Sequence, residues 1–305
     1  MLSVTCLGTS AARPTVERNV SSLVLVREGE TLMFDCGEGT QRQMMRYGAS
    51  FSLEHIYITH YHADHFLGVT GLLRTLGLQG RTEPLHLFGP KGAHRILGSV
   101  VSLGVERPPF EIDITELAPG DTLKREDFDL EVFPTEHARH SIGYALVEHE
   151  RLGRFHPERA RELGIPEGPL WGKLHKGETV KLADGRTVGP GDLVDAARPG
   201  RKVVYSGDTK PCKSVVDAAH DADLLIHEAT FGEEEKDRAA ETEHSTAAGA
   251  AQVALAAQVR RLILCHVSAR YSRDARPLEK QAREIFPNAE VARDGVTIDV
   301  PFRAS

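Results

Sequence analysis

The run from His60 to His65, which reads His-Tyr-His-Ala-Asp-His, constrains this chain more than any other feature. It directly follows the apolar run Ile56–Thr59, so a strand would deliver three imidazoles and one carboxylate into the loop after it. Such side chains are ordinary zinc ligands, but four are too many for one tetrahedral ion that keeps an open position. We therefore expect His60 and His62 to bind one ion. Asp64 and His65 would then bind a second.

Further donor residues also follow strand-like runs. These are His137 after Leu130–Phe133, Asp208 after Lys202–Tyr205, and His266 after Leu262–Leu264. Donors at the ends of separate strands are what a rigid sheet needs to fix a metal site, whereas a solvated histidine-rich loop, the alternative interpretation, needs none. A carboxylate bridges two cations better than an imidazole does, so we assign Asp208 to both ions. The expected ligand sets are His60, His62, His137 and Asp208 at one ion, and Asp64, His65, His266 and Asp208 at the other.

Strand-like and helix-like segments succeed one another along the chain. The expected strands are Ser22–Val26 and Thr31–Phe34 as a hairpin, Ile56–Thr59, Leu85–Phe88, Leu130–Phe133, Lys202–Tyr205, Leu224–Ile226 and Leu262–Leu264. The expected helices are Phe66–Leu76, Ala93–Leu103, Thr246–Gln258 and Leu278–Ile285. Ser245 is the expected N-cap of the third helix. Two packed sheets covered by helices fit this order, so we predict one mixed α/β catalytic domain over residues 1–305.

The segment from Glu148 to Gly200 differs from the rest because it is dense in glycine, proline and charge. We expect an insertion that projects from the core, and not a second domain. Between Arg151 and Lys181, seven Lys/Arg and four Glu give +3, although the whole chain carries -7. A solvated loop of mixed charge is the plain alternative. Clustered cations favour phosphate binding, so the acidic overall charge does not exclude a nucleic-acid substrate.

The composition is that of a soluble globular protein, with 40% hydrophobic and 27% charged residues. No apolar run is long enough to span a membrane, and the N-terminus lacks the pattern of a secretory signal. We therefore expect a cytoplasmic enzyme without a membrane partner. The four cysteines, Cys6, Cys36, Cys212 and Cys265, form no C-x-x-C pair, which favours reduced, buried thiols.

The metal-ligand pattern resembles that of the metallo-β-lactamase superfamily, and the surrounding motifs are similar to those of the ribonuclease Z family. These motifs are Leu7–Ala11, Arg18–Ser22, Phe34–Gln41, Ser206–Thr209, His227–Thr230, His244–Thr246 and His266–Tyr271. The resemblance implies a four-layer αββα fold and a zinc-dependent endoribonuclease that removes the 3′ trailer of precursor tRNA. It implies two zinc ions per subunit, a tRNA with a 3′-hydroxyl and a trailer with a 5′-phosphate. It also implies a homodimer and a flexible tRNA-binding arm, or exosite, over residues 148–200.

The same resemblance implies roles for individual residues. The seven metal ligands are His60, His62, Asp64, His65, His137, Asp208 and His266. His137 is preferred over His140 because of its spacing to Gly143. Asp64 is also the implied general base, acting on water whose pKa the ions lower. His244 lies near the scissile phosphate, where it would protonate the leaving oxygen or stabilise its charge; the alternative is helix-capping context beside Ser245.

Other residues have supporting roles in this interpretation. We expect Glu228 to orient His244 and Asp35 to orient a ligand histidine, although Asp35 could equally satisfy N–H groups of its own loop. The expected RNA contacts are Arg151, Arg154, Lys173, Lys176 and Arg270. Trp171 would either stack on RNA or pack the arm. The loop Ala11–Val16 lacks the lysine usual in the family and has Arg13 nearby, which puts an RNA-contacting role for that loop in doubt.

Two other functions compete with this one. A different hydrolase on the same fold, such as a thioesterase, a lactonase or a small-molecule phosphodiesterase, would share the ligands but would not be expected to have the basic arm or the motif His266–Tyr271. A non-catalytic RNA-binding protein would show degenerate ligands, and none of the seven is missing.

Overall fold

The computed structural model describes residues 1–105 and 107–303, which form two compact units. The first unit comprises Met1–Arg125, Asp129–Leu146 and Arg201–Ser305, and the second comprises Glu126–Phe128 and Val147–Gly200.

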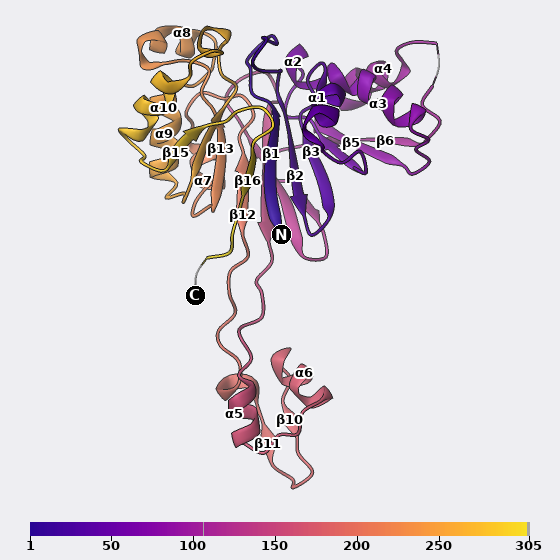
Figure 1. The fold of residues 1–305 in the computed structure, drawn as a ribbon, viewed down its shortest axis with the longest axis vertical. Coiled ribbons are helices and arrows are strands. Elements are labelled where there is room, and N and C mark those ends of the chain that lie inside the picture. The colour runs from indigo at the N-terminus through magenta and orange to yellow at the C-terminus, as the bar shows by residue number, and fades with distance from the viewer. Residues whose placement is uncertain (106, 304–305) are drawn as a thin grey trace. The chain divides into compact units, whose positions relative to one another are not determined.

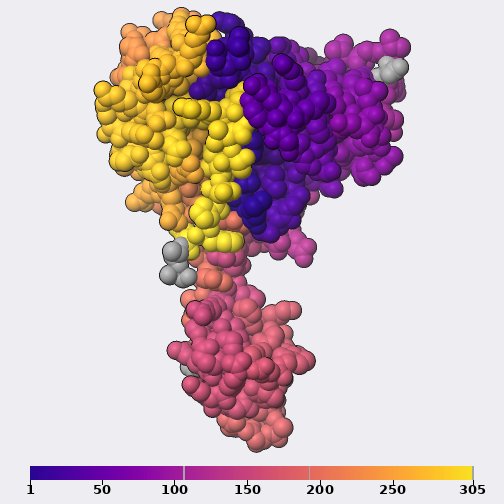
Figure 2. Space-filling model, viewed as in Figure 1, coloured from indigo at the N-terminus to yellow at the C-terminus, as the bar shows by residue number. Residues whose placement is uncertain are grey.

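The first unit contains two seven-stranded sheets (Figure 1). The first sheet has the order β16 (Thr297–Asp299), β1 (Leu2–Gly8), β2 (Ser22–Arg27), β3 (Glu30–Phe34), β4 (His55–Tyr57), β5 (Leu85–Pro90) and β6 (Ile112–Leu117). Strands β3 to β6 run parallel to one another, whereas β16, β1, β2 and β3 pair antiparallel. The pairing of β16 with β1 brings the C-terminal segment beside the N-terminal strand, as the yellow and indigo surfaces of Figure 2 show.

The second sheet has the order β15 (Ala289–Val291), β14 (Leu262–Cys265), β13 (Leu224–Glu228), β12 (Lys202–Tyr205), β9 (Ile142–Glu148), β8 (Phe128–Pro134) and β7 (Thr122–Lys124). Strands β12 to β15 are parallel. Because the carboxyl ends of parallel strands meet at one edge, the loops after β12, β13 and β14 are brought together there.

Helices cover the outer faces of both sheets (Figure 1). Those beside the first sheet are α1 (Thr40–Tyr47), α2 (Ala63–Phe66), α3 (Gly68–Leu78) and α4 (Ala93–Ser102). Those beside the second sheet are α7 (Lys213–Ala218), α8 (Lys236–Glu241), α9 (Ala247–Ala256) and α10 (Arg276–Arg283), with the 3₁₀ turns η2 (Glu233–Glu235) and η3 (Ala269–Tyr271). The predicted four-layer αββα architecture is therefore confirmed.

Aromatic side chains fill part of the space between the two sheets. The ring of Phe34 on β3 lies 5.2 Å from that of Tyr57 on β4 and 5.5 Å from that of Tyr144 on β9. The Tyr144 hydroxyl donates a hydrogen bond of 2.7 Å to the carbonyl of Ile58. Buried aromatic rings stabilise such a core, and the polar tip of the tyrosine ties the second sheet to the end of β4, where the metal-binding motif begins.

Each expected strand and helix has a counterpart, but one local prediction was wrong. Ser245 does not cap α9, because its hydroxyl donates to the carbonyl of Thr209; Thr246 is the N-cap and accepts from the N–H of Gly249. The helix expected over Phe66–Leu76 corresponds to α3, and the short helix α2 precedes it. The break between them reflects close packing, since a Cβ on Gly68 would lie 1.9 Å from the carbonyl oxygen of Gly37.

The second unit has its own small hydrophobic core. It contains α5 (Pro157–Glu162), α6 (Pro169–His175), β10 (Val180–Lys181), β11 (Thr187–Val188) and η1 (Pro190–Asp192). Its core consists of Ala160, Ile165, Leu174, Val180, Leu182 and Leu193. Trp171 packs against this core, and its indole N–H donates to the carbonyl of Ile165 at 3.2 Å. Of the two alternatives for Trp171, the structure therefore shows packing within the unit.

None of the helices in the described residues combines the length and the apolar character needed to cross a lipid bilayer. All four cysteines are buried and unpaired. Burial raises the pKa of Cys6 and of Cys36 to about 12, so these thiols stay protonated at neutral pH.

Candidate metal centre

The expected metal ligands lie at the strand ends of the first unit. His60 follows β4, Asp208 follows β12, and His266 comes directly after β14. The short helix α2 carries Asp64 and His65. Because the loops of both sheets meet at this edge, donors far apart in the sequence become neighbours.

Two clusters of donor atoms lie at this edge. One contains His60, His62, His137 and Asp208, the other contains Asp64, His65 and His266, and within each the donor atoms lie within 4.8 Å of one another. Oδ2 of Asp208 lies 3.2 Å from Nε2 of His65 and 3.2 Å from Nε2 of His266. The same oxygen lies 3.7 Å from Nε2 of His60. Asp208 therefore faces both clusters, as a bridging ligand must.

The chemistry of these atoms fits bound divalent cations. Nε2 of His65 lies 3.4 Å from Nε2 of His266, and nitrogen lone pairs this close repel unless a proton or a cation lies between them. Nε2 of His60 and Oδ1 of Asp208 are buried and have no hydrogen-bond partner in the described part of the chain, which is costly without a ligand. Burial holds the pKa of His60 well below its ordinary value, so the imidazole is neutral, as metal binding requires.

A buried carboxylate, Asp35, orients two of the histidines. Its Oδ2 accepts from Nδ1 of His65 at 2.8 Å and from the Tyr205 hydroxyl at 2.9 Å. The Thr59 hydroxyl donates to Oδ2 of Asp35 at 2.9 Å and lies 3.0 Å from Nδ1 of His60, from which it accepts. Both imidazoles therefore direct Nε2 toward the centre. The N–H that Asp35 accepts is that of Thr59, not those of its own glycine-rich loop.

A second buried carboxylate, Glu228 at the end of β13, contacts His244 directly and His266 through the hydroxyl of Thr230. Its Oε1 accepts from Nδ1 of His244 at 2.7 Å, and its Oε2 accepts from the Thr230 hydroxyl at 2.8 Å. The same hydroxyl lies 2.8 Å from Nδ1 of His266. Burial alone would lower the pKa of His244, but the carboxylate of Glu228 outweighs it and raises the pKa to about 9. Glu228 thus favours an imidazolium at His244.

The backbone at the centre adopts unusual conformations. Asp35 and His266 have φ of 54° and 53°, in the left-handed region that side chains other than glycine avoid. Gly207 has φ +60°, and a Cβ there would lie 2.8 Å from Cβ of Thr59. The loop that carries Asp208 therefore packs directly against the residue that orients His60. Such strain is held in place only where the surrounding structure fixes it.

A pocket of about 390 Å³ opens over the donor clusters. Its lining residues include His62, Asp64, Asp208, His244 and His266 from the centre, and also Ala12, Arg13, Thr230, Phe231, Arg238, Thr242 and Arg270. The N–H of Ala12 donates to Oδ2 of Asp64 at 2.8 Å and fixes that carboxylate. Phe231 and Arg238 could not be identified as pocket residues from the sequence, because no motif or spacing marks them.

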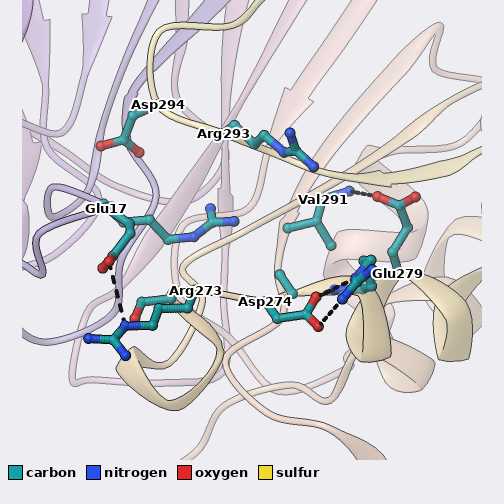
Figure 3. Close-up of a pocket in the computed structure, with 11 residues that line it drawn as sticks. Glu17, Arg273, Asp274, Glu279, Val291, Arg293 and Asp294 are labelled. Carbon is teal, nitrogen blue, oxygen red and sulfur yellow. Dashed lines mark hydrogen bonds and ion pairs between the residues drawn. The ribbon is translucent and has the colours of Figure 1, made fainter.

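A second pocket, of about 520 Å³, contains none of the donor residues (Figure 3). Two of its arginines are paired with carboxylates. Arg273 lies 3.7 Å from Glu17, and Arg276 lies 2.7 Å from Asp274. Although this pocket is larger, its lining contains neither the metal donors nor His244, so the smaller pocket is the candidate active site.

The remaining predicted residues fall into three groups. Arg270 lines the active-site pocket and forms an ion pair with Glu235. Arg151, Arg154, Lys173 and Lys176 belong to the second unit, where Arg154, Lys173 and Lys176 are exposed and Arg151 is half-buried. His140 is exposed and lies outside both donor clusters, which agrees with the preference for His137.

The fold and the donor set define a protein of the metallo-β-lactamase superfamily. The family model described as "Metallo-beta-lactamase superfamily" matches residues 15–216, and that described as "Beta-lactamase superfamily domain" matches residues 175–267.

Comparison with individual proteins narrows this class. The chain is 58% identical to ribonuclease Z of Gemmatimonas aurantiaca over 98% of this chain and 96% of that protein. It is 52% identical to ribonuclease Z of Myxococcus xanthus over 99% of each chain. The crystal structure of human tRNase Z, short form, matches with a TM-score of 0.72 and 28% identity, covering 98% of this chain and 100% of that one. The chain belongs to the ribonuclease Z family.

Proposed function

We propose that this chain is a zinc-dependent endoribonuclease that cleaves precursor tRNA at its 3′ side and removes the trailer. The observation that carries the proposal is that His244, hydrogen-bonded to the buried Glu228, lines the same pocket as donors from both metal clusters. The relatives named ribonuclease Z support the tRNA substrate over the other hydrolases of the superfamily, and the complete donor set argues against a non-catalytic binding protein.

The metal donors would bind two zinc ions, since imidazole nitrogens and carboxylate oxygens are ordinary zinc ligands. When bound, the ions would hold the scissile phosphate and lower the pKa of the attacking water. Metal analysis of the purified protein checks the stoichiometry. Close to two zinc ions per chain is expected, and a protein that binds no divalent metal would contradict the catalytic proposal.

Asp64 is the group to which we assign the proton of the attacking water. Burial alone would raise its pKa, but the neighbouring imidazoles of His266 and His65 lower the pKa, so the carboxylate is ionised and can accept a proton. The N–H of Ala12 holds this carboxylate from outside the donor clusters.

His244 would act on the leaving group. Its Nδ1–H is bound to Glu228, and its side chain lines the active-site pocket, so Nε2 is the atom left to face the substrate. An imidazolium there would donate its proton to the leaving 3′ oxygen or stabilise its negative charge. Cleavage would leave a 3′-hydroxyl on the tRNA and a 5′-phosphate on the trailer.

The second unit would act as the tRNA-binding arm. Its exposed cations Arg154, Lys173 and Lys176 suit phosphate contacts, and Arg270 and Arg151 are further candidates for such contacts. We also propose that the protein is a cytoplasmic homodimer. Analytical ultracentrifugation at several concentrations tests the dimer, and a single monomeric species would contradict it.

The decisive experiment is to map the product ends of an unprocessed tRNA, with and without a chelator. A single cut on the 3′ side that leaves a 3′-hydroxyl, and that disappears when the chelator is added, is expected. Intact tRNA together with chelator-sensitive hydrolysis of bis(p-nitrophenyl) phosphate would instead indicate a different hydrolase.

A further inference from the structure

The active-site pocket is lined by positively charged side chains in addition to the metal donors. Three arginines, Arg13, Arg238 and Arg270, line it, whereas the carboxylates that line it, Asp64 and Asp208, both belong to the donor clusters. Bound cations would neutralise those two carboxylates. Any of these arginines that is not already ion-paired therefore remains available to an anionic substrate.

The arginines differ in what already holds them. Arg270 is ion-paired with Glu235. Arg238, on α8, is exposed, and within residues 1–105 and 107–303 no carboxylate forms an ion pair with it. Two of the acidic residues before it in the chain, Glu233 and Glu234, have other partners. Oε2 of Glu233 accepts from the hydroxyl of Thr246, and Oε1 of Glu234 accepts from the hydroxyl of Tyr271.

An aromatic ring links Arg238 to the leaving-group side of the centre. The guanidinium of Arg238 lies 5.9 Å from the ring centroid of Phe231, within the range of a cation–π contact. The ring of Phe231 is buried and lies 6.1 Å from that of His244. The backbone of Phe231 is fixed as well, since its carbonyl accepts from the N–H of Ala247 at 2.9 Å. Phe231 thus restricts Arg238 to the side of the pocket where His244 lies.

We propose that Arg238 binds a phosphate of the RNA next to the scissile phosphate, on the side of the leaving 3′ oxygen. The inference rests on the proposed function, because it takes His244 as the group that faces that oxygen. A guanidinium forms charge-assisted hydrogen bonds to phosphate oxygens in a planar, paired geometry. Arg238 is then a substrate-contacting residue that places the RNA strand, and Phe231 is a positioning residue that acts through it.

The test compares Arg238→Ala with Lys236→Ala. Both remove one positive charge from α8, but Lys236 does not line the pocket. With precursor tRNA, Arg238→Ala is expected to raise KM about tenfold to a hundredfold, the effect of losing hydrogen bonds to a charged group, with a smaller change in kcat. The dependence of log(kcat/KM) on log[salt] should become shallower by about 0.7–0.9, as for one lost phosphate contact. Lys236→Ala should change neither quantity.

Further variants and a small substrate separate the possible outcomes. Hydrolysis of bis(p-nitrophenyl) phosphate, which has no neighbouring phosphate, should fall far less in Arg238→Ala than cleavage of precursor tRNA does, and Arg238→Lys should recover part of the KM. Phe231→Leu should give an intermediate KM. An equal loss on both substrates, or an equal effect of Lys236→Ala, overturns the proposal. If the unmodified protein hydrolyses the small diester but does not cut precursor tRNA, the proposed function itself fails; if it cuts precursor tRNA and Arg238→Ala is unchanged, only this inference fails.

Discussion

Nδ1 of His244 donates a hydrogen bond of 2.7 Å to Oε1 of the fully buried Glu228. Burial alone would lower the pKa of His244, but this carboxylate raises the pKa to about 9. The protonated form that would assist the leaving group exists below that pKa. Bound cations would oppose this rise, and loss of the carboxylate charge would lower the pKa of His244 further.

Glu228→Gln should therefore slow cleavage and move the basic limb of the pH profile of kcat/KM to lower pH. The reason is that the neutral amide no longer stabilises the imidazolium, so His244 loses its proton at lower pH. Zinc content should stay unchanged, because the amide oxygen can still accept from the Thr230 hydroxyl. A basic limb that stays in place, or a loss of zinc, would contradict the orienting role.

Threonine hydroxyls connect the two buried carboxylates to histidines of the donor clusters. Thr59 lies between Asp35 and His60, and Thr230 lies between Glu228 and His266. Replacing either with valine keeps the shape but removes the acceptor for Nδ1–H, so metal affinity should fall by about 10–100-fold. Zinc competition with a chromophoric chelator measures this. Thr5→Val, which changes a hydroxyl on β1 that contacts Thr297, is the matched control and should have no effect on affinity.

Asp35 should matter for folding as well as for metal binding. Its removal leaves the Thr59 N–H, the Tyr205 hydroxyl and Nδ1–H of His65 buried without their acceptor. Each such group costs about 1–3 kcal/mol, so Asp35→Ala should lower the free energy of unfolding in urea by several times the effect of a surface change. Asp237→Ala, on the exposed face of α8, is the control. Equal stability of the two variants would contradict this account.

The strands and the donor residues could be predicted from the sequence because their signals are local. An apolar run that ends in histidines or aspartate carries both the strand and the ligand in one stretch, as Ile56–Thr59 before His60 does. The grouping of the donors into two clusters could also be predicted, from the number of ligands that one tetrahedral ion can take. Helix α1 (Thr40–Tyr47), by contrast, was missed, because two of its three buried residues, Thr40 and Gln43, are polar and do not read as a core-facing side.

The remaining parts of the site depend on contacts between distant segments. Thr59 reads as an ordinary strand residue, and its role appears only when folding brings the carboxylate of Asp35 within hydrogen-bond distance of its hydroxyl. Ser245 is a suitable cap by residue type, but its hydroxyl donates a hydrogen bond to the carbonyl of Thr209, and Thr246 is the cap instead. Phe231 and Arg238 carry no local signal of function. Tertiary packing decides all of these cases.

The second unit offers a clean deletion. The backbones of Arg151 and Arg198 pair with each other through two hydrogen bonds of 2.8 Å, so residues 152–197 can be replaced by a short glycine–serine turn between them. This deletion removes every residue of the small hydrophobic core, so no part of that core is left exposed to solvent. We expect the KM for precursor tRNA to rise strongly and hydrolysis of bis(p-nitrophenyl) phosphate to persist, since the donor clusters belong to the first unit. Equal loss of both activities would contradict a role in tRNA binding.

His244 itself needs a test that separates an acid from a metal ligand. Asp208, His244 and His266 also form a group whose donor atoms lie within 4.8 Å of one another, so His244 is close enough to bind an ion. Its Nδ1–H is bound to Glu228, which leaves Nε2 for either role, and the expected ligand His266 has the same type of support from Thr230. We expect His244→Ala to retain two zinc ions per chain while kcat falls by about 10²–10⁴, the usual contribution of general acid catalysis. His266→Ala should lose one ion. If His244→Ala loses an ion as well, His244 is a ligand, and the proton for the leaving oxygen must come from another group.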